Sequence, residues 1–226
     1  MEKQFSHIAS LIGDSARATI LWTLLDGKAY TATELAISSN ISAQNASMHL
    51  NKLLQADLLA VENQGRHRYY KFSRQEVAYA IEALANLVPY DLAKTKDSIG
   101  NDSAIKYCRT CYDHLAGRVG VLITDSLLKQ KFIIERDKTF EVTAKGLKWF
   151  TIAGINIDEL KLQRRVFARP CLDWSERRHH ISGSLGAAML DKMLSSDWIR
   201  KIKNSRAMVI TAKGQKAFYE NFKISV

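Results

Sequence analysis

The chain has 226 residues, of which 46% are hydrophobic, and a formal net charge of +10. These values predict a globular protein of one large or two small domains. No apolar run approaches the length of a membrane span, and the N-terminus lacks the basic-then-apolar order of a secretory signal, so we expect a cytoplasmic protein without membrane contact. Three cysteines, a small and odd number, argue against a disulfide framework.

Two short helices are predicted at the N-terminus. Apolar residues recur at helical spacing over residues 4–12, and Asp14 can cap a second helix that runs to Leu25 before Gly27 stops it. Arg17 on this second helix is expected to form a surface salt bridge, with a phosphate contact as the alternative.

A helix-turn-helix pattern follows. Thr31-Ala-Thr-Glu34 is a capping box that opens a helix through Ile37. Ser42 can cap a second helix over residues 43–54, whose apolar positions recur at helical spacing. Its other face carries short or amide-bearing side chains of the kind that contact base edges and phosphates when a helix enters a major groove. These residues are Gln44, Asn45, Ser47, Met48, His49 and Lys52.

A β-hairpin with a basic tip is predicted after this helix. Two β-prone runs, residues 58–61 and 66–72, flank a turn that contains Gly65. Another capping box, Ser73-Arg-Gln-Glu76, then predicts a helix that ends before Pro89. We expect base contacts from Gln44, Asn45, Ser47 and His49, and backbone contacts from Ser42, Lys52, Arg66 and Arg68, with His67 in the same hairpin tip.

At these residues the chain resembles the ArsR family of bacterial winged-helix repressors. The resemblance runs from Ile12 to about Leu87, and it rests on four motifs: Ile12-Gly-Asp-Ser-Ala-Arg17, Thr33-Glu-Leu-Ala36, the segment Ser42 to Leu50, and Gly65-Arg66 before Tyr69-Tyr70. It implies a homodimer that binds double-stranded DNA at a roughly palindromic site. Many metal-sensing members carry a pair of cysteines in the helix that corresponds to Glu34–Ile37. This chain has none there, so that metal site is absent.

The charge is unevenly distributed. Residues 1–96 carry a net charge of +1 and residues 97–226 carry +9. Either the second region also faces phosphates, or it attracts an anionic effector, or it is a solvated surface. We divide the chain into a DNA-binding and dimerisation domain (1–92), a polar linker (93–106) and a C-terminal sensory domain (107–226).

The C-terminal domain contains an internal repeat. His114-Leu-Ala-Gly-Arg-Val-Gly120 matches His180-Ile-Ser-Gly-Ser-Leu-Gly186, and Val142-Thr-Ala-Lys-Gly146 matches Ile210-Thr-Ala-Lys-Gly214. Each unit, 114–150 and 180–218, is predicted to be a helix, a hairpin and a Thr-capped helix. The expected fold class is therefore α+β, mainly helical with β-hairpins: a winged helix-turn-helix domain followed by two wing-like repeats.

Cysteines and histidines occur at related places in the two repeats. Cys108, Cys111 and His114 are spaced at three-residue intervals, as on one side of a helix, and Cys171 and Asp173 precede His180. If the halves face each other, these six residues could form a site for zinc or another soft divalent metal. Three other interpretations remain open: buried structural residues, a reactive thiol beside arginines, and an organic ligand between the repeats.

The sequence contains no catalytic constellation, so we predict a protein that is not an enzyme. The favoured function is a homodimeric transcriptional regulator, a repressor, that responds to a small effector through its C-terminal domain. The alternatives are a metal- or thiol-dependent enzyme with a DNA-targeting domain, and an effector-free architectural DNA-binding protein.

Overall fold

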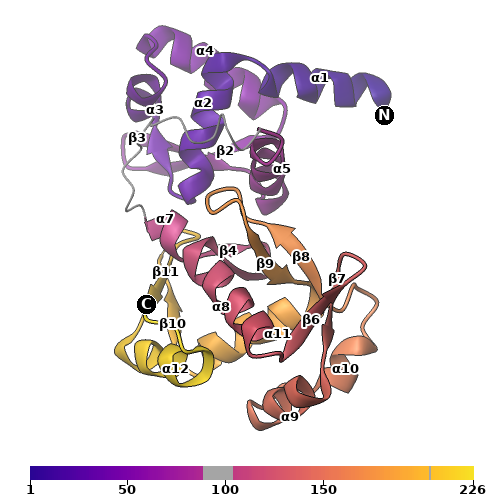
Figure 1. Cartoon of the computed structure of the whole chain (residues 1–226). Helices are drawn as coiled ribbons and strands as arrows, with labels where there is room; N and C mark the ends of the chain where they lie inside the picture. Colours follow the sequence, from indigo (N-terminus) through magenta and orange to yellow (C-terminus); the bar gives the residue numbers. More distant parts are fainter. Residues whose placement is uncertain (89–103, 204) are drawn as a thin grey trace. The chain divides into compact units, whose positions relative to one another are not determined.

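The computed structural model describes residues 1–88, 104–203 and 205–226. They form two compact units, Met1–Leu87 and Val88–Val226 (Figure 1). The predicted domain boundary at residue 92 lies outside the described residues. Residues 93–103 of the predicted linker are likewise not described, but its last residues, 104–106, belong to a short helix, α7 (Ala104–Tyr107), and so are not linker.

The N-terminal unit has the predicted helix-turn-helix. Helices α1 (Glu2–Ile12) and α2 (Ser15–Thr23) precede a 3-10 turn, η1 (Leu24–Asp26), and Asp14 accepts a hydrogen bond at the start of α2 as expected. The Thr31–Glu34 capping box opens α3 (Ala32–Ser38). Ser42 caps α4 (Ala43–Gln55), which buries Ala46, Leu50 and Leu53.

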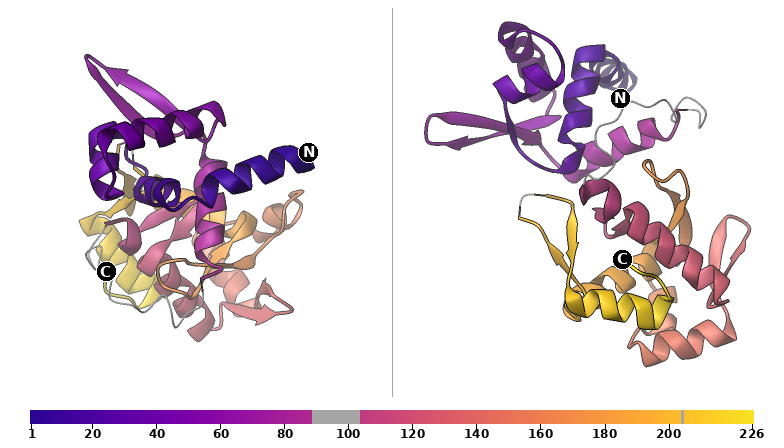
Figure 2. Two further views of the ribbon diagram at one scale, coloured as in Figure 1. Left: turned by 90° about the horizontal axis from the view of Figure 1, so that it is seen from above. Right: turned by 60° about the vertical axis from the view of Figure 1, so that its left-hand side comes forward.

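A three-stranded antiparallel sheet completes this unit. Strands β2 (Leu59–Gln64) and β3 (His67–Phe72) form the predicted hairpin, and the short β1 (Tyr30–Thr31) pairs with β3. The tip of the β2–β3 hairpin extends beyond the helices of its unit in both views of Figure 2. This hairpin is the wing of a winged helix.

The last helix of the unit, α5 (Gln75–Ala85), is shorter than predicted. Its N-cap is Arg74, and the predicted capping box at Ser73 is wrong, because the Ser73 hydroxyl donates to the carbonyl of Asp57 instead. Among the described residues no single helix is long and apolar enough to cross a membrane, although the segments Glu2–Ile12 and Ser15–Asp26, bent by 81°, together match that length and composition.

The C-terminal unit contains the same order of elements twice. The first set is β4 (Arg109–Cys111), β5 (His114–Ala116), α8 (Gly117–Lys129), β6 (Ile133–Arg136), β7 (Thr139–Val142) and α9 (Ala144–Ile152). After α10 (Ile157–Lys161) the second set is β8 (Arg169–Leu172), β9 (His179–Ser182), α11 (Gly183–Ser195), β10 (Ile199–Lys201), β11 (Met208–Ile210) and α12 (Ala212–Phe222). Each set is a hairpin, a helix, a second hairpin and a Thr-capped helix.

The sequence prediction missed the first hairpin of each set. Cys108, Cys111 and His114 were expected on one side of a helix, but β4 and β5 form an antiparallel hairpin in which Cys111 lies opposite His114. The turn has only two residues, and Tyr112 there has a positive φ of 60°. Three-residue spacing fits a tight hairpin as well as a helix, so spacing alone could not decide.

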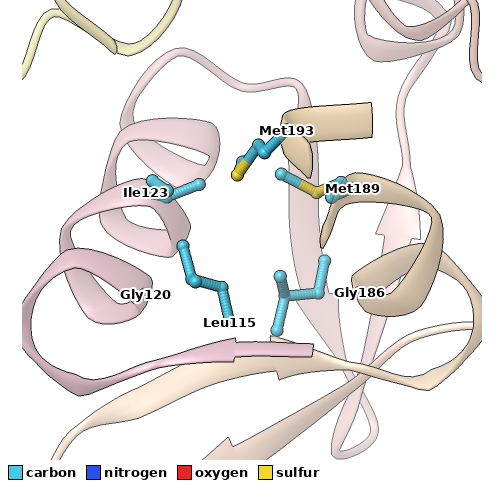
Figure 3. Close-up of a pocket in the computed structure, with 7 residues that line it drawn as sticks. Leu115, Gly120, Ile123, Gly186, Met189 and Met193 are labelled. Carbon is cyan, nitrogen blue, oxygen red and sulfur yellow. The ribbon is translucent and has the colours of Figure 1, made fainter. Parts of the chain in front are cut away.

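The two sets share one hydrophobic core and are linked by backbone hydrogen bonds between their hairpins. Helices α8 and α11 face each other across a small apolar cavity bordered by Ile123, Met189 and Met193 (Figure 3). The hairpin β4–β5 is joined to β10–β11 through the Arg109–Ala207 bridge, and the Phe140 N–H donates to the Ala168 carbonyl beside β8. Each first hairpin is therefore attached to the second hairpin of the other set.

Two glycines explain the Thr-Ala-Lys-Gly matches. A Cβ on Gly146 would lie 1.9 Å from the Phe132 carbonyl oxygen, and a Cβ on Gly214 would lie 1.9 Å from the Trp198 carbonyl oxygen. In both places the Thr hydroxyl caps the helix by accepting from the glycine N–H. The close approach of helix and strand backbones requires glycine.

We expect Gly146→Ala to lower the free energy of unfolding of the C-terminal unit by about 2 kcal/mol or more, because the obstacle is backbone that cannot rotate away. Urea denaturation of the full chain measures it. Lys148→Ala, on an exposed position of the same helix, is the matched control. An unchanged midpoint for Gly146→Ala would show that the strand can shift.

Candidate nucleic-acid interface and metal centre

Helix α4 presents a polar, exposed face. Gln44, Asn45, Ser47 and Lys52 are all exposed, as predicted. Ser42 accepts a hydrogen bond from the Asn45 N–H at 3.2 Å, so its side chain holds the N-terminus of the helix. The Ser47 hydroxyl donates to the Ala43 carbonyl at 2.9 Å, which leaves its lone pairs available. This face has the donors and acceptors that base edges require.

The wing tip is basic and exposed. Arg66, His67 and Arg68 flank the turn, and none of them is buried. The guanidinium of Arg68 lies 5.7 Å from the centroid of the Tyr70 ring, which limits its range of positions. Exposed cations at the end of a hairpin suit contacts with phosphates.

His49 is the exception among the predicted base-contacting residues. Its side chain is only 12% exposed, and Nδ1 lies 3.3 Å from the Arg17 guanidinium and 3.6 Å from the Asp14 carboxylate. His49 therefore faces α2 and is not a free side chain on the groove face of α4. The helical period puts position 49 at the edge of the polar face, where the sequence does not reveal whether a side chain turns inward.

Arg17 was assigned a surface role, and that assignment is wrong. Arg17 is only 7% exposed. Its Nε donates to the Leu11 carbonyl at 2.6 Å, and its Nη2 donates to the Ser10 carbonyl at 3.0 Å. It thus satisfies the C-terminal carbonyls of α1 while it holds His49 on α4. A charged residue between apolar positions of an amphipathic helix was the available signal.

Arg17→Ala should destabilise the N-terminal unit by about 2 kcal/mol, because it leaves the α1 carbonyls without their donor. Thermal unfolding monitored by circular dichroism measures this change. Arg74→Ala, which removes an exposed ion pair with Asp57, should cost at most about 1 kcal/mol. Equal effects of the two substitutions would contradict the structural role of Arg17.

Four ligand-type side chains converge in the C-terminal unit. Cys111, His114, Cys171 and His180 each offer one donor atom, and these atoms lie within 4.8 Å of one another. The two histidine Nε2 atoms are 3.2 Å apart. Tetrahedral ligands at zinc-like bond lengths lie about 3.3–3.8 Å from each other, so the four donors would have to move by at most about 1–1.5 Å to surround a four-coordinate metal ion.

The hairpin register produces this arrangement. Cys111 lies opposite His114 in β4–β5, and Cys171 lies opposite His180 in β8–β9. Strands β5 and β9 are neighbours, so each hairpin supplies one thiol and one imidazole. The β8–β9 hairpin has a longer loop than the β4–β5 hairpin. The two cysteines are therefore separated by a different number of residues from the two histidines.

Two of the six predicted ligands are not in the cluster. Cys108 is fully buried in the hydrophobic core, and burial raises the pKa of its thiol to about 12. Asp173 lies beside the cluster, with its carboxylate 3.3 Å from Nδ1 of His180. Its oxygens also accept from the Arg109 guanidinium and the Gly117 N–H. Asp173 therefore contacts His180, a member of the cluster, from the side away from the other three donors.

The Arg109–Asp173 ion pair is completely buried. Burial alone would raise the pKa of Asp173, but the hydrogen bond to His180 and the charge of Arg109 hold it well below its usual range. The same carboxylate raises the pKa of His180 against the opposing effect of burial. Removing one member of such a pair leaves an uncompensated buried charge.

The environment of Cys111 disfavours its thiolate form. Hydrogen bonding to Cys171 and burial raise the pKa of Cys111 to about 11. At neutral pH this thiol is protonated, and a thiol rather than a thiolate is a weak nucleophile. The predicted activation by nearby arginines is therefore absent at Cys111, and a metal ion would have to displace its proton on binding.

A glycine on each long helix lies beside the histidine of the other set. A Cβ on Gly120 would lie 3.6 Å from the His180 Cβ, and a Cβ on Gly186 would lie 3.1 Å from the His114 Cβ. Both would also meet a backbone carbonyl at 2.6 Å. The matching His-x-x-Gly-x-x-Gly segments thus place each histidine over the helix of the other set. This spacing was visible in the sequence, although its purpose was not.

A family model described as a helix-turn-helix domain matches residues 12–62. Over all 226 residues, and over the whole of its relative, the chain is 43% identical to YdfF, an uncharacterized HTH-type transcriptional regulator of Bacillus subtilis (strain 168). The chain belongs to the family of HTH-type transcriptional regulators. The predicted class of function is thereby confirmed.

Similar solved structures cover only part of this regulator. A winged helix-turn-helix domain of Mb0332 from Mycobacterium bovis, a possible ArsR-family regulator, is 21% identical over 36% of this chain and 75% of its own, with a TM-score of 0.34. The cadmium sensor CMTR from Mycobacterium tuberculosis is 30% identical over 41% of this chain and 93% of its own, with a TM-score of 0.32.

Proposed function

We propose that this regulator is a homodimeric repressor that reads duplex DNA with α4 and the wing. The observation that carries the proposal is the exposed amide and hydroxyl face of α4 beside a basic wing tip. Gln44, Asn45 and Ser47 contact base edges, and Lys52, Arg66 and Arg68 contact the backbone, with His67 beside them. Ser42 caps α4, and His49 positions it. The repressor role rests on the resemblance to the ArsR family.

Exposed apolar side chains in the N-terminal unit support the dimer. Phe5 on α1 is 73% exposed, and Leu87, just beyond α5, is 77% exposed. Leu84 on α5 is also exposed. Large apolar groups that face solvent are typical of a surface that a second copy covers.

Gln44→Ala should weaken specific DNA binding by about 1–3 kcal/mol and leave non-specific binding nearly unchanged, because a base contact is lost and no charge is removed. Sites selected from random duplexes supply the specific DNA, and titration by fluorescence anisotropy supplies the affinities. A dimer predicts that the selected sites contain inverted halves about one helical turn apart.

The matched control is Gln55→Ala, which removes the same exposed amide from the other end of α4. Arg66→Ala should instead weaken binding to all sequences and reduce its salt dependence by about one phosphate contact. Equal losses of specific and non-specific binding in Gln44→Ala would remove this residue from base recognition.

We further propose that the Cys111, His114, Cys171 and His180 cluster binds zinc and that the metal controls repression. Two thiolates and two neutral imidazoles balance the charge of a divalent ion, and this donor set is typical of tetrahedral zinc. When bound, zinc supplies a fixed link between the two hairpins. Since the protein provides all four ligands, the arrangement favours a structural or sensing role over catalysis.

Purified wild-type protein should contain about one zinc per chain, and Cys111→Ser and Cys171→Ser should lose it, because a hydroxyl cannot replace a thiolate at this metal. Elemental analysis of protein prepared without chelator measures the content. Cys108→Ala is the matched control, because Cys108 lies outside the cluster, and it should keep the metal.

Operator affinity measured before and after zinc removal distinguishes the possible roles of the metal. A change in affinity supports metal-responsive regulation. Bound zinc without any change in affinity would reduce the metal to a structural link and favour an effector-free DNA-binding protein. Wild-type protein with three titratable thiols and no metal would overturn the proposal.

A further inference from the structure

Both histidines of the cluster have a carboxylate on their outer nitrogen. Nδ1 of His114 lies 3.3 Å from Oδ1 of Asp113, and Nδ1 of His180 lies 3.3 Å from Oδ2 of Asp173. The inner Nε2 atoms are the pair that lies 3.2 Å apart. A carboxylate accepts and never donates when ionised, so each one favours the tautomer with the proton on Nδ1.

Each carboxylate is held by an arginine from elsewhere in the unit. The Arg165 guanidinium, between α10 and β8, forms an ion pair with Asp113, in which its Nη2 lies 3.3 Å from Oδ1. The Arg109 guanidinium, at the start of β4, lies 2.9 Å from Oδ2 of Asp173. Asp113 and Arg109 belong to the first set of elements, and Asp173 to the second. Both ion pairs thus connect segments far apart in the sequence.

We propose that Asp113 and Asp173 are positioning residues for the metal. Each one fixes the ring of its histidine and keeps the proton on Nδ1, so that the Nε2 lone pair is directed at the ion. A carboxylate on the outer nitrogen also makes an imidazole a stronger ligand. The inference rests on the proposed zinc site and identifies what orients its two nitrogen ligands.

The two positions are unequal. Asp173 is fully buried with Arg109, whereas the side chains of Asp113 and Arg165 are 32% and 40% exposed. Water therefore screens the Asp113–Arg165 ion pair and not the Arg109–Asp173 ion pair. His180 is held more rigidly than His114, and loss of Asp173 should weaken metal binding more than loss of Asp113.

Asp173 also has a structural task, which complicates its use as a test. Its Oδ1 accepts from the N–H groups of Ser175 and Glu176, and its Oδ2 accepts from Gly117. Asp173→Asn would leave Arg109 buried without its counter-charge and can therefore prevent folding. The carboxylate of Asp113 instead contacts the side chains of His114 and Arg165, so Asp113→Asn is the cleaner variant.

The experiment measures zinc affinity of the full chain by competition with a chromophoric chelator. Asp113→Asn should bind zinc about ten-fold more weakly than wild type, and Asp173→Asn, if it folds, up to about a hundred-fold. Asp197→Asn is the matched control, because Asp197 also pairs with an arginine, Arg200, but contacts no histidine. It should retain wild-type affinity.

A second measurement separates positioning from stability. Long-range proton–nitrogen NMR of the zinc-loaded protein should show His114 and His180 protonated at Nδ1 and ligated through Nε2. The thermal midpoint of metal-free Asp113→Asn should fall no more than that of Asp197→Asn. Unchanged zinc affinity in Asp113→Asn, or ligation of His114 through Nδ1, would overturn the positioning role. Failure of the wild type to bind zinc would instead overturn the metal site itself.

Discussion

The C-terminal unit depends on one buried ion pair, Arg109–Asp173. A guanidinium and a carboxylate without access to water are tolerated only when their hydrogen bonds are satisfied, and here the same carboxylate also accepts from Gly117 and approaches His180. Arg109 begins the β4–β5 hairpin, and Asp173 lies in the turn of the β8–β9 hairpin. The pair therefore connects two hairpins that the sequence separates by about sixty residues, and it lies directly beside the Cys/His cluster.

Much of the N-terminal unit could be predicted because its signals are local. The Thr31–Glu34 capping box, the Ser42 cap and the Gly65 turn each act within a few residues, and the structure confirms all three. The predicted cap at Ser73 was wrong because the Ser73 hydroxyl donates to a tertiary acceptor, the Asp57 carbonyl, instead of capping the helix. The predicted roles of Arg17 and His49 were wrong for a similar reason. Their hydrogen-bond partners lie on other helices, and the helical periodicity of the sequence does not indicate such partners.

The candidate metal site was only partly predictable. Ligand types and repeat spacing pointed to the four residues of the cluster, Cys111, His114, Cys171 and His180. They also pointed to Cys108, which is buried in the hydrophobic core, and to Asp173, which contacts His180 from outside the cluster. The reason is the hairpin. A helix would have placed Cys108, Cys111 and His114 on one side, whereas in a strand pair the ligands are cross-strand neighbours, and Cys108 precedes the first strand. Asp113 was not among the predicted ligands, and the structure places its carboxylate beside Nδ1 of His114.

The paired glycines argue that the cluster needs both sets of elements. Gly120 lies beside His180 and Gly186 beside His114, and a Cβ on either glycine would lie 2.6 Å from a backbone carbonyl oxygen, so each helix passes close to the histidine of the other set. Each hairpin supplies two donors, which is too few for a tetrahedral ion. A metal bound here must therefore connect the two sets. Each first hairpin is also joined to the second hairpin of the other set. A metal ion in the cluster would therefore restrain all four hairpins together.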